Sequence, residues 1–466
     1  MILSQQWDLV LGCNIKSLSY FRITLSILLT IELLLRYEYI HAFYSNEGIL
    51  PTSILNAKID SIYKIICIHN YNGSMIYQQI VLGIHIIASI SLGLGYKSRI
   101  CAGLCWFLYL SLTLRNTWLA FILDRYIHYL LFYCIFLPIS EIYSIDSYMK
   151  TNITIKDEKT KKSSIIISAS TILLKLQILW IYVDAGLGKY SDPTGGWTLD
   201  AIPLPALDTY ARHTVISRYL YGLLTPIGLR YLTPTVVYIE LGAVPCALLA
   251  SYFRNTRVLK IVILLICSLH IGIALTIKNT YLLSSVACIS WWIYYHPTES
   301  SSPVSSSSFT KTKSSSYIQL LFILPFIIGS IWFEQLSNEC TQSMEHIWST
   351  LLHNRWNVFT GAEEYVTWEI APGKLYNGMI VDVWSNTYNV SWFMPGTIEH
   401  DTFSAASAST TRKGRWRSYP YLADFESDEE KFLTWNYLCK QWNMEHASDY
   451  SLQKFNFFML QADSKL

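Results

Sequence analysis

The stretch "DAGLGKYSDPTGGW" (184–197) follows a long apolar run and carries the residue types best suited to acid–base chemistry. It contains an acid, a lysine and two glycines before the lysine: Asp184, Lys189, Gly186 and Gly188. Apolar surroundings disfavour the ammonium form of a lysine, so a buried lysine can accept a proton near neutral pH. Glycines there weaken the helix by roughly 1 kcal/mol each and let the backbone approach a ligand or another helix. Lys189 is therefore a candidate base, and the alternative is a lysine that extends to the membrane surface.

A second polar group lies in "LRNTWLAFILDRYIHYLLFY" (114–133). Asp124 and His128 are four residues apart, so on a helix they share one face. Ionisable groups inside a membrane span are costly and usually have a partner or a function. The alternative is a network of satisfied polar groups at the end of a helix, to which Arg115 and Asn116 would belong.

Other ionisable or polar residues stand singly inside apolar runs, where they are costly and usually have a partner or a function. Glu32 has Arg36 one helical turn away, which predicts a local ion pair. Glu240 has no partner nearby in the sequence. His270 is interpreted as a hydrogen-bonded core residue, for which Asn279 is one candidate partner, or as a functional group.

The composition indicates which kind of secondary structure positions these residues. Of the 466 residues, 52% are apolar and only 15% are charged, with a mean hydropathy of +0.29. These values are typical of a polytopic membrane protein and not of a soluble one. We expect an all-α bundle of about nine transmembrane helices, at 18–35, 76–94, 100–114, 119–138, 163–188, 232–251, 257–277, 280–296 and 316–334.

Two further features complete the expected membrane region. The segment 199–231 is less apolar and is interrupted by Pro203, Pro205 and Pro226, so we expect a re-entrant or interfacial segment with one short helix. The formal net charge of +2 gives no indication of a nucleic-acid partner. Membrane lipid is the expected environment.

Lysine and arginine in the short loops predict the orientation. With a cytoplasmic N-terminus, the basic clusters fall on one side, at 96–99, 141–162, 254–260 and 311–313. The C-terminus is then lumenal or exoplasmic. The glycosylation sequons at Asn72 and Asn389 fall on that outer side, although the one at Asn152 does not. The endoplasmic reticulum is the favoured membrane, with an organellar or bacterial inner membrane as alternatives.

We expect two domains. Residues 1–334 form the membrane domain, which includes a serine-rich linker at 298–316. Residues 335–466 form a small mixed α+β region on the lumenal or exoplasmic side. Alternating residues predict strands within 379–394, and a helix is predicted over 428–443, capped by Ser427 and Asp428.

The ten cysteines include no CxxC pair and no zinc-site spacing, so no metal site is expected. Most lie in predicted spans as small buried residues. An oxidising lumen would allow one disulfide among Cys67, Cys340 and Cys439, and the pairing stays open.

Several blocks resemble the HTTM (horizontally transferred transmembrane domain) family, which includes the vitamin K-dependent gamma-glutamyl carboxylases. The most specific block is "LKLQILWIYVDAGLGKYSDPTGGW" (174–197). Others are "SLSYFRITLSILLTIELLLRYEYIHAFYSNEGILP" (17–51), "LGLGYKSRI" (92–100), "YARH" (210–213) and "HIGIALTI" (270–277). The segment 415–443 is similar to the tail of bacterial-type members. The resemblance covers about residues 15–335.

The resemblance implies roles for particular residues. Lys189 matches the base that deprotonates reduced vitamin K, with Gly188 where the carboxylases have a second lysine. Asp124 or His128 would assist this step, and His270 matches a further membrane histidine. The residues implied for binding the reduced vitamin K, or a related hydroquinone, are Gln177, Gly186, Gly188 and His213.

Three functions stay open. The first is a carboxylase-type enzyme that uses a reduced quinone, CO2 and O2. The second is a non-catalytic subunit held among other membrane subunits, in which Lys189 forms a structural pair with Asp184 or Asp192. The third is a quinone- or lipid-binding protein without carboxylation. The carboxylases have a much larger lumenal region than the roughly 130 residues here, which is why the second and third stay open.

Overall fold

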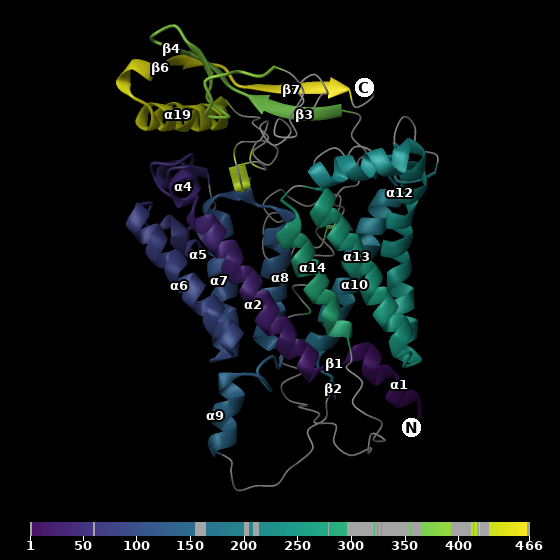
Figure 1. Ribbon diagram of the computed structural model, residues 1–466. Coiled ribbons are helices and arrows are strands. Elements are labelled where there is room, and N and C mark those ends of the chain that lie inside the picture. Colours follow the sequence, from purple (N-terminus) through teal and green to yellow (C-terminus); the bar gives the residue numbers. More distant parts are fainter. Residues whose placement is uncertain are drawn as a thin grey trace.

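Helices dominate the computed structural model, and small sheets occur near the C-terminus (Figure 1). The structure describes residues 2–58, 61–153, 165–199, 205–207, 214–277, 279–295, 365–392 and 428–463, with 321, 324, 328, 355–356, 412, 414–416 and 419. The serine-rich segment 298–316 and the predicted span 316–334 lie largely outside these residues. The prediction of a mostly helical membrane protein with C-terminal strands is confirmed at this level.

Five described helices are long and apolar enough to cross a membrane. They are α2 (Ile15–Tyr37), α6 (Met75–Leu94), α10 (Ala169–Tyr190), the second part of α12 (Ile227–Tyr252) and α13 (Thr256–Thr276). Three other predicted spans correspond to the shorter or less apolar helices α7 (Ser98–Arg115), α8 (Ile122–Phe136) and α14 (Tyr281–Trp291). The other helices before residue 154 are short: α1 (Ile2–Leu11), α3 (Ile40–Phe43), α4 (Thr52–Lys58), α5 (Ser61–Ile66) and α9 (Ile145–Ile153).

Helix α6 illustrates how the sequence gives these elements. The Ser74 side chain accepts a hydrogen bond from the Tyr77 amide at 3.4 Å and begins the helix. Gly95 ends it in the left-handed conformation, with φ of 75°. Ile80 and Ile84 are exposed on one face, whereas polar side chains such as Gln78 lie buried on the other. Exposed apolar residues and buried polar residues are the pattern expected for a helix whose outer face contacts lipid.

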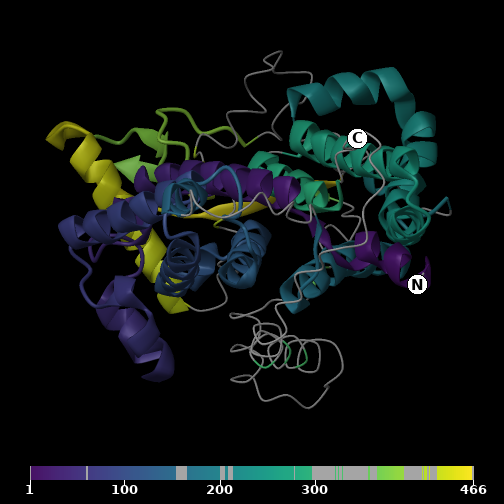
Figure 2. The same ribbon diagram turned by 90° about the horizontal axis from the view of Figure 1, so that it is seen from below.

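The helices form two groups that meet at α14 (Figures 1 and 2). Helix α2 packs on α6, and α7 packs on α6 and α8; on the other side, α12 packs on α10 and α13. Helix α14 contacts α13 as well as α2 and α8, and so joins the groups. A two-residue strand pair, β1 (Cys13–Asn14) with β2 (Ile165–Ile166), ties the start of α2 to the segment before α10.

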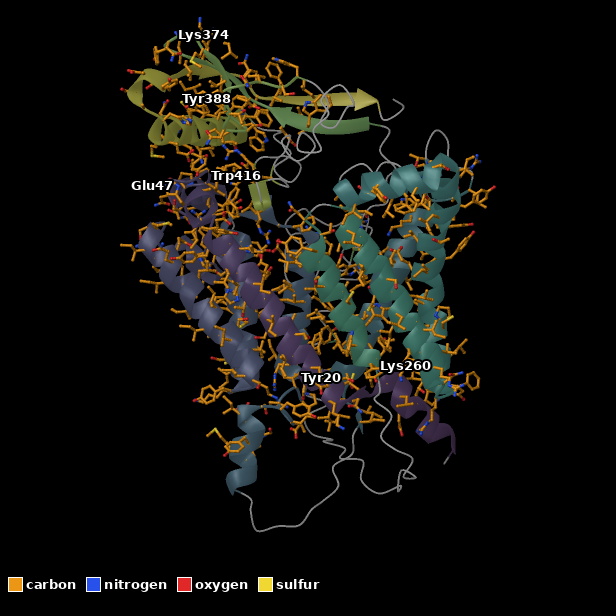
Figure 3. All side chains as sticks on the ribbon, in the orientation of Figure 1. Tyr20, Glu47, Lys260, Lys374, Tyr388 and Trp416 are labelled. Atoms are coloured by element: carbon orange, nitrogen blue, oxygen red, sulfur yellow. The ribbon has the colours of Figure 1, made fainter. Side chains whose placement is uncertain are left out.

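The basic loops lie at the end of the bundle opposite the C-terminal region. Figure 3 places Tyr20 and Lys260 at one end and Glu47, Trp416 and Lys374 at the other. The turn between α6 and α7 is held against the start of α9, because the Asp146 carboxylate accepts the Lys97 amide at 2.8 Å. The clusters within 96–99, 141–153 and 254–260 therefore share one end of the molecule.

The C-terminal region has two antiparallel sheets and one helix. Strand β3 (Tyr365–Ile370) pairs with β7 (Phe458–Asp463), and β4 (Pro372–Leu375) lies between β5 (Ile380–Asp382) and β6 (Leu452–Phe455). Helix α19 (Asp428–Glu445) confirms the predicted helix. Strands were predicted within 379–394, and in the described part of this stretch only β5 and an isolated bridge between Asp382 and Thr387 have β pairing. The chain turns after β5, where the Asp382 carboxylate accepts hydrogen bonds from the Ala371 and Trp384 amides.

The expected lumenal disulfide does not form between the two described candidates. Cys67 and Cys439 are both free thiols, and Cys340 lies outside the described residues. Cys67 is fully buried, and its thiol donates to the Ser111 carbonyl at 3.2 Å. The prediction failed for Cys67 because its place after α5 buries it against α7, where it contacts the helix backbone.

Candidate functional site

Lys189 of α10 and Glu240 of α12 form a buried ion pair. The Lys189 Nζ lies 3.0 and 2.9 Å from the two Glu240 carboxylate oxygens. Both residues are almost fully buried, at 4% and 5% exposure. The ammonium group also lies 5.5 Å from the centre of the Trp197 ring. An ammonium and a carboxylate at this distance neutralise each other, so the pair brings no net charge into the apolar bundle.

The partner of Lys189 differs from the expected one. Asp184 does not pair with it; its carboxylate accepts the Trp356 amide. Asp192 accepts the Thr194 amide at 3.3 Å in the following turn. The reason is geometric: Lys189 lies on the α10 face that packs against α12, and Glu240 lies directly opposite on that helix. The prediction of Asp184 or Asp192 as partner is therefore wrong.

Gly186 brings the two helices close enough for this pair. A Cβ atom at Gly186 would lie 2.7 Å from the Leu241 side chain and 3.4 Å from the Glu240 Cβ. The close approach expected at these glycines thus occurs at Gly186 and is made to another helix. Gly188 is half-buried, and Gln177 is buried three turns earlier on α10.

An apolar cavity of about 360 Å³ ends at the ion pair. Its walls come from α12 and α13, with Trp197 and Leu207 beside them. Hydroxyl groups at the wall come from Ser217, Thr235, Ser268 and Thr276. The other lining side chains are apolar: Leu220, Leu224, Leu229, Leu232, Val236, Ile239, Leu265, Leu269, Ile273 and Ile277. Such a cavity suits a molecule with a large apolar part and a small polar head.

The other predicted site residues lie elsewhere. The His270 ring contacts Tyr182, whose hydroxyl lies 2.6 Å from the histidine Nε2, so Tyr182 rather than Asn279 is its partner. His128 stacks on Trp106, with ring centres 5.1 Å apart. In the part of the chain that the structure describes, neither histidine lines the cavity, nor does Asp124. His213 lies outside the described residues.

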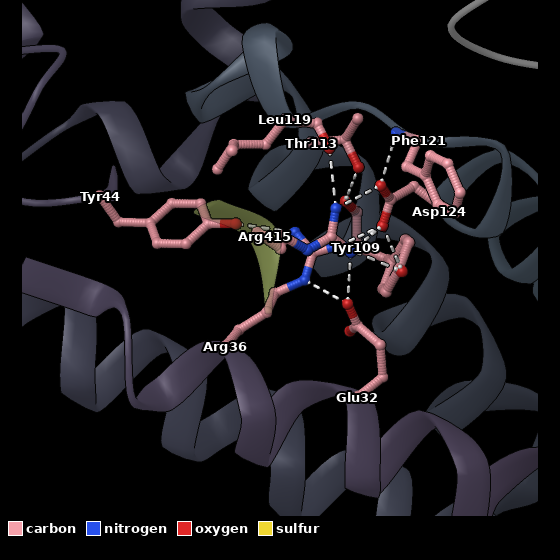
Figure 4. Close-up of polar contacts among 9 residues, drawn as sticks. All are labelled: Glu32, Arg36, Tyr44, Tyr109, Thr113, Leu119, Phe121, Asp124 and Arg415. Carbon is pink, nitrogen blue, oxygen red and sulfur yellow. Dashed lines mark hydrogen bonds and ion pairs between the residues drawn. The ribbon is translucent and has the colours of Figure 1, made fainter. Parts of the chain in front are cut away.

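Asp124 belongs to a second buried group of charges, the four-charge cluster of Glu32, Arg36, Asp124 and Arg415 (Figure 4). The predicted local pair is confirmed, because the Arg36 Nε donates to Glu32 at 2.5 Å. Arg36 also donates to Asp124. The Tyr109 hydroxyl donates to the Asp124 carboxylate at 2.8 Å, and the Phe121 amide donates to it at 2.8 Å.

Arg415 enters this cluster from the C-terminal region. Its guanidinium donates to Asp124 at 2.6 and 2.7 Å and to Glu32 at 2.6 Å. Burial and the nearby Arg36 charge act to lower the pKa of Arg415, but the Asp124 and Glu32 carboxylates outweigh them and raise its pKa above the ordinary value. The cluster thus contains two cations and two anions. Sequence reasoning missed Arg415, whose only signal was its place in the tail block resembling bacterial-type family members.

The comparisons with known proteins found no match. None of the protein-family models compared with the sequence matches it. No curated protein and no solved structure matches it either. Among the described residues, no three metal-binding side chains gather at one point.

We predict that Lys189→Met destabilises the protein by about 3–5 kcal/mol, because Glu240 is left as a buried charge without its partner. The double variant Lys189→Met/Glu240→Leu should recover most of this loss, since both charges are removed together. Unfolding in a denaturing detergent measures both effects. The control is Lys175→Met, a buried lysine of α10 whose Nζ donates to the Leu9 carbonyl at 2.8 Å. A double variant that is no more stable than Lys189→Met would contradict the pairing.

We predict that Arg415→Met loosens the C-terminal region from the bundle, because the cluster then holds two carboxylates and one guanidinium. Limited chymotrypsin digestion in detergent should cut the C-terminal region about tenfold faster, as expected for a loss of about 1.4 kcal/mol. The matched control is Arg412→Met, whose guanidinium donates to the Trp384 carbonyl at 2.8 Å within that region. Cleavage at the bundle contact that is no faster in Arg415→Met than in Arg412→Met would argue against the docking role.

Proposed function

We propose that this chain is an integral membrane protein that binds a reduced quinone, with the quinone head group beside the Lys189–Glu240 pair. The observation that carries the proposal is the buried acid–base pair at the end of an apolar cavity of about 360 Å³. Ligand pockets in proteins commonly occupy about 300–1,000 Å³ and combine apolar walls with few polar groups. A quinone ring with the start of its apolar chain fits that description.

The Lys189–Glu240 pair can hold and pass a proton. The ammonium and the carboxylate are 2.9 Å apart, so a proton can shift from the lysine to the glutamate and leave an amine. Either the carboxylate or this amine can accept a proton from a hydroxyl group in the cavity. The pair therefore extends the expected role of Lys189, because its partner can take over the proton that the ammonium releases.

The quoted resemblance to the HTTM family supports a carboxylase-like chemistry at this pair. A reduced quinone of the vitamin K type supplies the strong base for carboxylation when it is oxygenated. In our proposal, Lys189 and Glu240 take up the first proton, and the nearby cavity walls keep water away. The reaction with CO2 and a glutamyl substrate belongs to the proposal through the resemblance.

We extend the proposal to the membrane arrangement. The shorter helices α7, α8 and α14 would cross the bilayer beside the five long ones, and 316–334 would add the ninth span. The shared end of the basic loops supports a cytoplasmic N-terminus and a lumenal C-terminal region. The endoplasmic reticulum is the membrane we propose.

The test uses the full chain in phosphatidylcholine liposomes with vitamin K1 hydroquinone, oxygen and labelled CO2. We expect quinone oxidation and CO2 incorporation into a glutamate-rich peptide. Because proton transfer by a positioned group contributes roughly 10²–10⁴-fold, Lys189→Ala should lose about a hundredfold or more. Glu240→Gln should lose activity as well. Lys175→Met, which removes a buried lysine away from the cavity, should retain it.

A binding measurement separates the alternatives. If the wild type and Lys189→Ala are equally inactive with every quinone offered, the enzyme proposal fails. Binding of labelled vitamin K1 hydroquinone that depends on Lys189 would then leave a quinone-binding protein. If the wild type shows neither activity nor binding, the Lys189–Glu240 pair is better explained as a structural pair in a non-catalytic subunit of a larger complex.

A further inference from the structure

Helix α12 (Val215–Tyr252) is broken at Thr225, and the break divides it into two parts with different surroundings. Thr225 has φ of 59° and ψ of 165°, which is a conformation that glycine adopts readily and β-branched residues rarely do. In Figure 1 the first part of α12 runs across the outer end of α13, and the second part runs along the bundle. We call residues 215–224 the lid segment. Thr225 is its joint to the membrane helix.

The lid segment lines one side of the cavity with one of its faces. Ser217, Leu220 and Leu224 line the cavity and are spaced three and four residues apart, as expected for one face of a helix. On the other face, Tyr219 and Leu223 are 77% and 72% exposed. A helix with an apolar inner face and exposed tyrosine and leucine outside suits the boundary between lipid and water. In the proposed membrane arrangement, this exposed face of the lid segment is directed toward lipid.

Within the described part of the chain, a hydrogen bond joins the N-terminal end of the lid segment to α13. The Thr214 hydroxyl donates to the Leu275 carbonyl at 2.8 Å, near the end of that helix. The same hydroxyl accepts the Ser217 amide at 2.9 Å and so caps the lid segment. At the other end, the Arg230 guanidinium donates to the Leu199 carbonyl at 3.0 Å and fixes the helix beyond the joint. Among the described residues, the lid segment thus has a joint at Thr225 and, at its N-terminal end, the exposed bond from Thr214 to Leu275, which we call the latch.

We propose that the lid segment pivots at Thr225 and lets an uncharged amphiphile with a long apolar chain enter the cavity sideways from the lumenal leaflet. This inference rests on the proposed function, since it concerns the same cavity. The latch from Thr214 to Leu275 opens first, and the apolar chain passes between the lid segment and α13. The head group then reaches Lys189 and Glu240.

The charge of the cavity sets the head-group class. Lys189 and Glu240 are the only ionisable side chains among the described residues that line it, and they neutralise each other. A fatty acid or phospholipid would bring a charge with no partner into an apolar space, which is costly. A hydroquinone or a long-chain alcohol brings only hydroxyl groups, which can bond to the pair or to the wall hydroxyls.

The rate of binding tests the lid. The full chain in phosphatidylcholine nanodiscs is mixed anaerobically with rising concentrations of vitamin K1 hydroquinone, and its fluorescence is followed. A gated cavity gives a rate that reaches a plateau set by lid opening. Thr214→Asp keeps a capping oxygen but has no proton to donate to Leu275, so its plateau should rise about threefold to tenfold. Thr214→Ser keeps both bonds and should match the wild type.

Two matched pairs complete the experiment. Leu220→Trp narrows the passage under the lid segment and should slow binding about tenfold, whereas Leu223→Trp, on the exposed face, should not. Oleyl alcohol should compete at least about tenfold better than oleate, which has the same chain and a charged head.

Each outcome bears on one claim. The lid proposal is overturned if the binding rate rises linearly with the hydroquinone concentration and is the same in Thr214→Asp and the wild type. The proposed function is then left intact. Oleate competing as well as oleyl alcohol overturns the uncharged class. If the wild type binds no quinone and no alcohol, the proposed function fails and the lid falls with it.

Discussion

The pairing of buried carboxylates with cations is the constraint on which both charged sites of this structure depend. Moving an ionised group out of water costs several kcal/mol, and the cost is offset only by a well-placed partner. The four-charge cluster and the Lys189–Glu240 pair both meet this condition, with donor–acceptor distances mostly between 2.5 and 3.0 Å. Each brings together helices that are far apart in the sequence. Side-chain charge therefore joins neighbouring helices in addition to the apolar packing.

The four-charge cluster also explains how the C-terminal region is joined to the bundle. Without Arg415, the membrane part would hold two carboxylates and one guanidinium, which is a net negative charge in an apolar place. The guanidinium from the C-terminal region completes the balance, and Trp416 packs beside it against Phe43, with ring centres 4.6 Å apart. The Asn279 side chain adds a bond to the Gly414 carbonyl at 3.1 Å. Three successive residues, Gly414, Arg415 and Trp416, thus join the C-terminal region to the bundle by a hydrogen bond, ion pairs and aromatic packing.

The sequence predicted what depends on local spacing. The helices, the pair of Glu32 and Arg36, and α19 follow from periodicity and from contacts within one turn. The partner of Lys189 is 51 residues away and the bonds from Arg415 to Asp124 span 291 residues, so helix packing decides them. The prolines in 199–231 indicated an irregular segment, yet the break falls at Thr225, directly before Pro226, since the residue before a proline avoids the helical conformation. The prolines indicated irregularity within 199–231 without singling out Thr225, and only the packed structure places the lid segment beside the cavity.

The surroundings of Lys189 follow from the same packing. Its ammonium lies 2.9 Å from the Glu240 carboxylate, which neutralises its charge inside the bundle. The helix that carries Lys189 is held from outside as well, because Asp184, five residues earlier, accepts the Trp356 amide, and the Trp356 ring packs 5.3 Å from Tyr126 of α8. A shift of the C-terminal contacts would therefore act on α10 near the pair. Because Gly186 leaves α10 and α12 in close contact, a small displacement there would change the distance between the ammonium and the carboxylate.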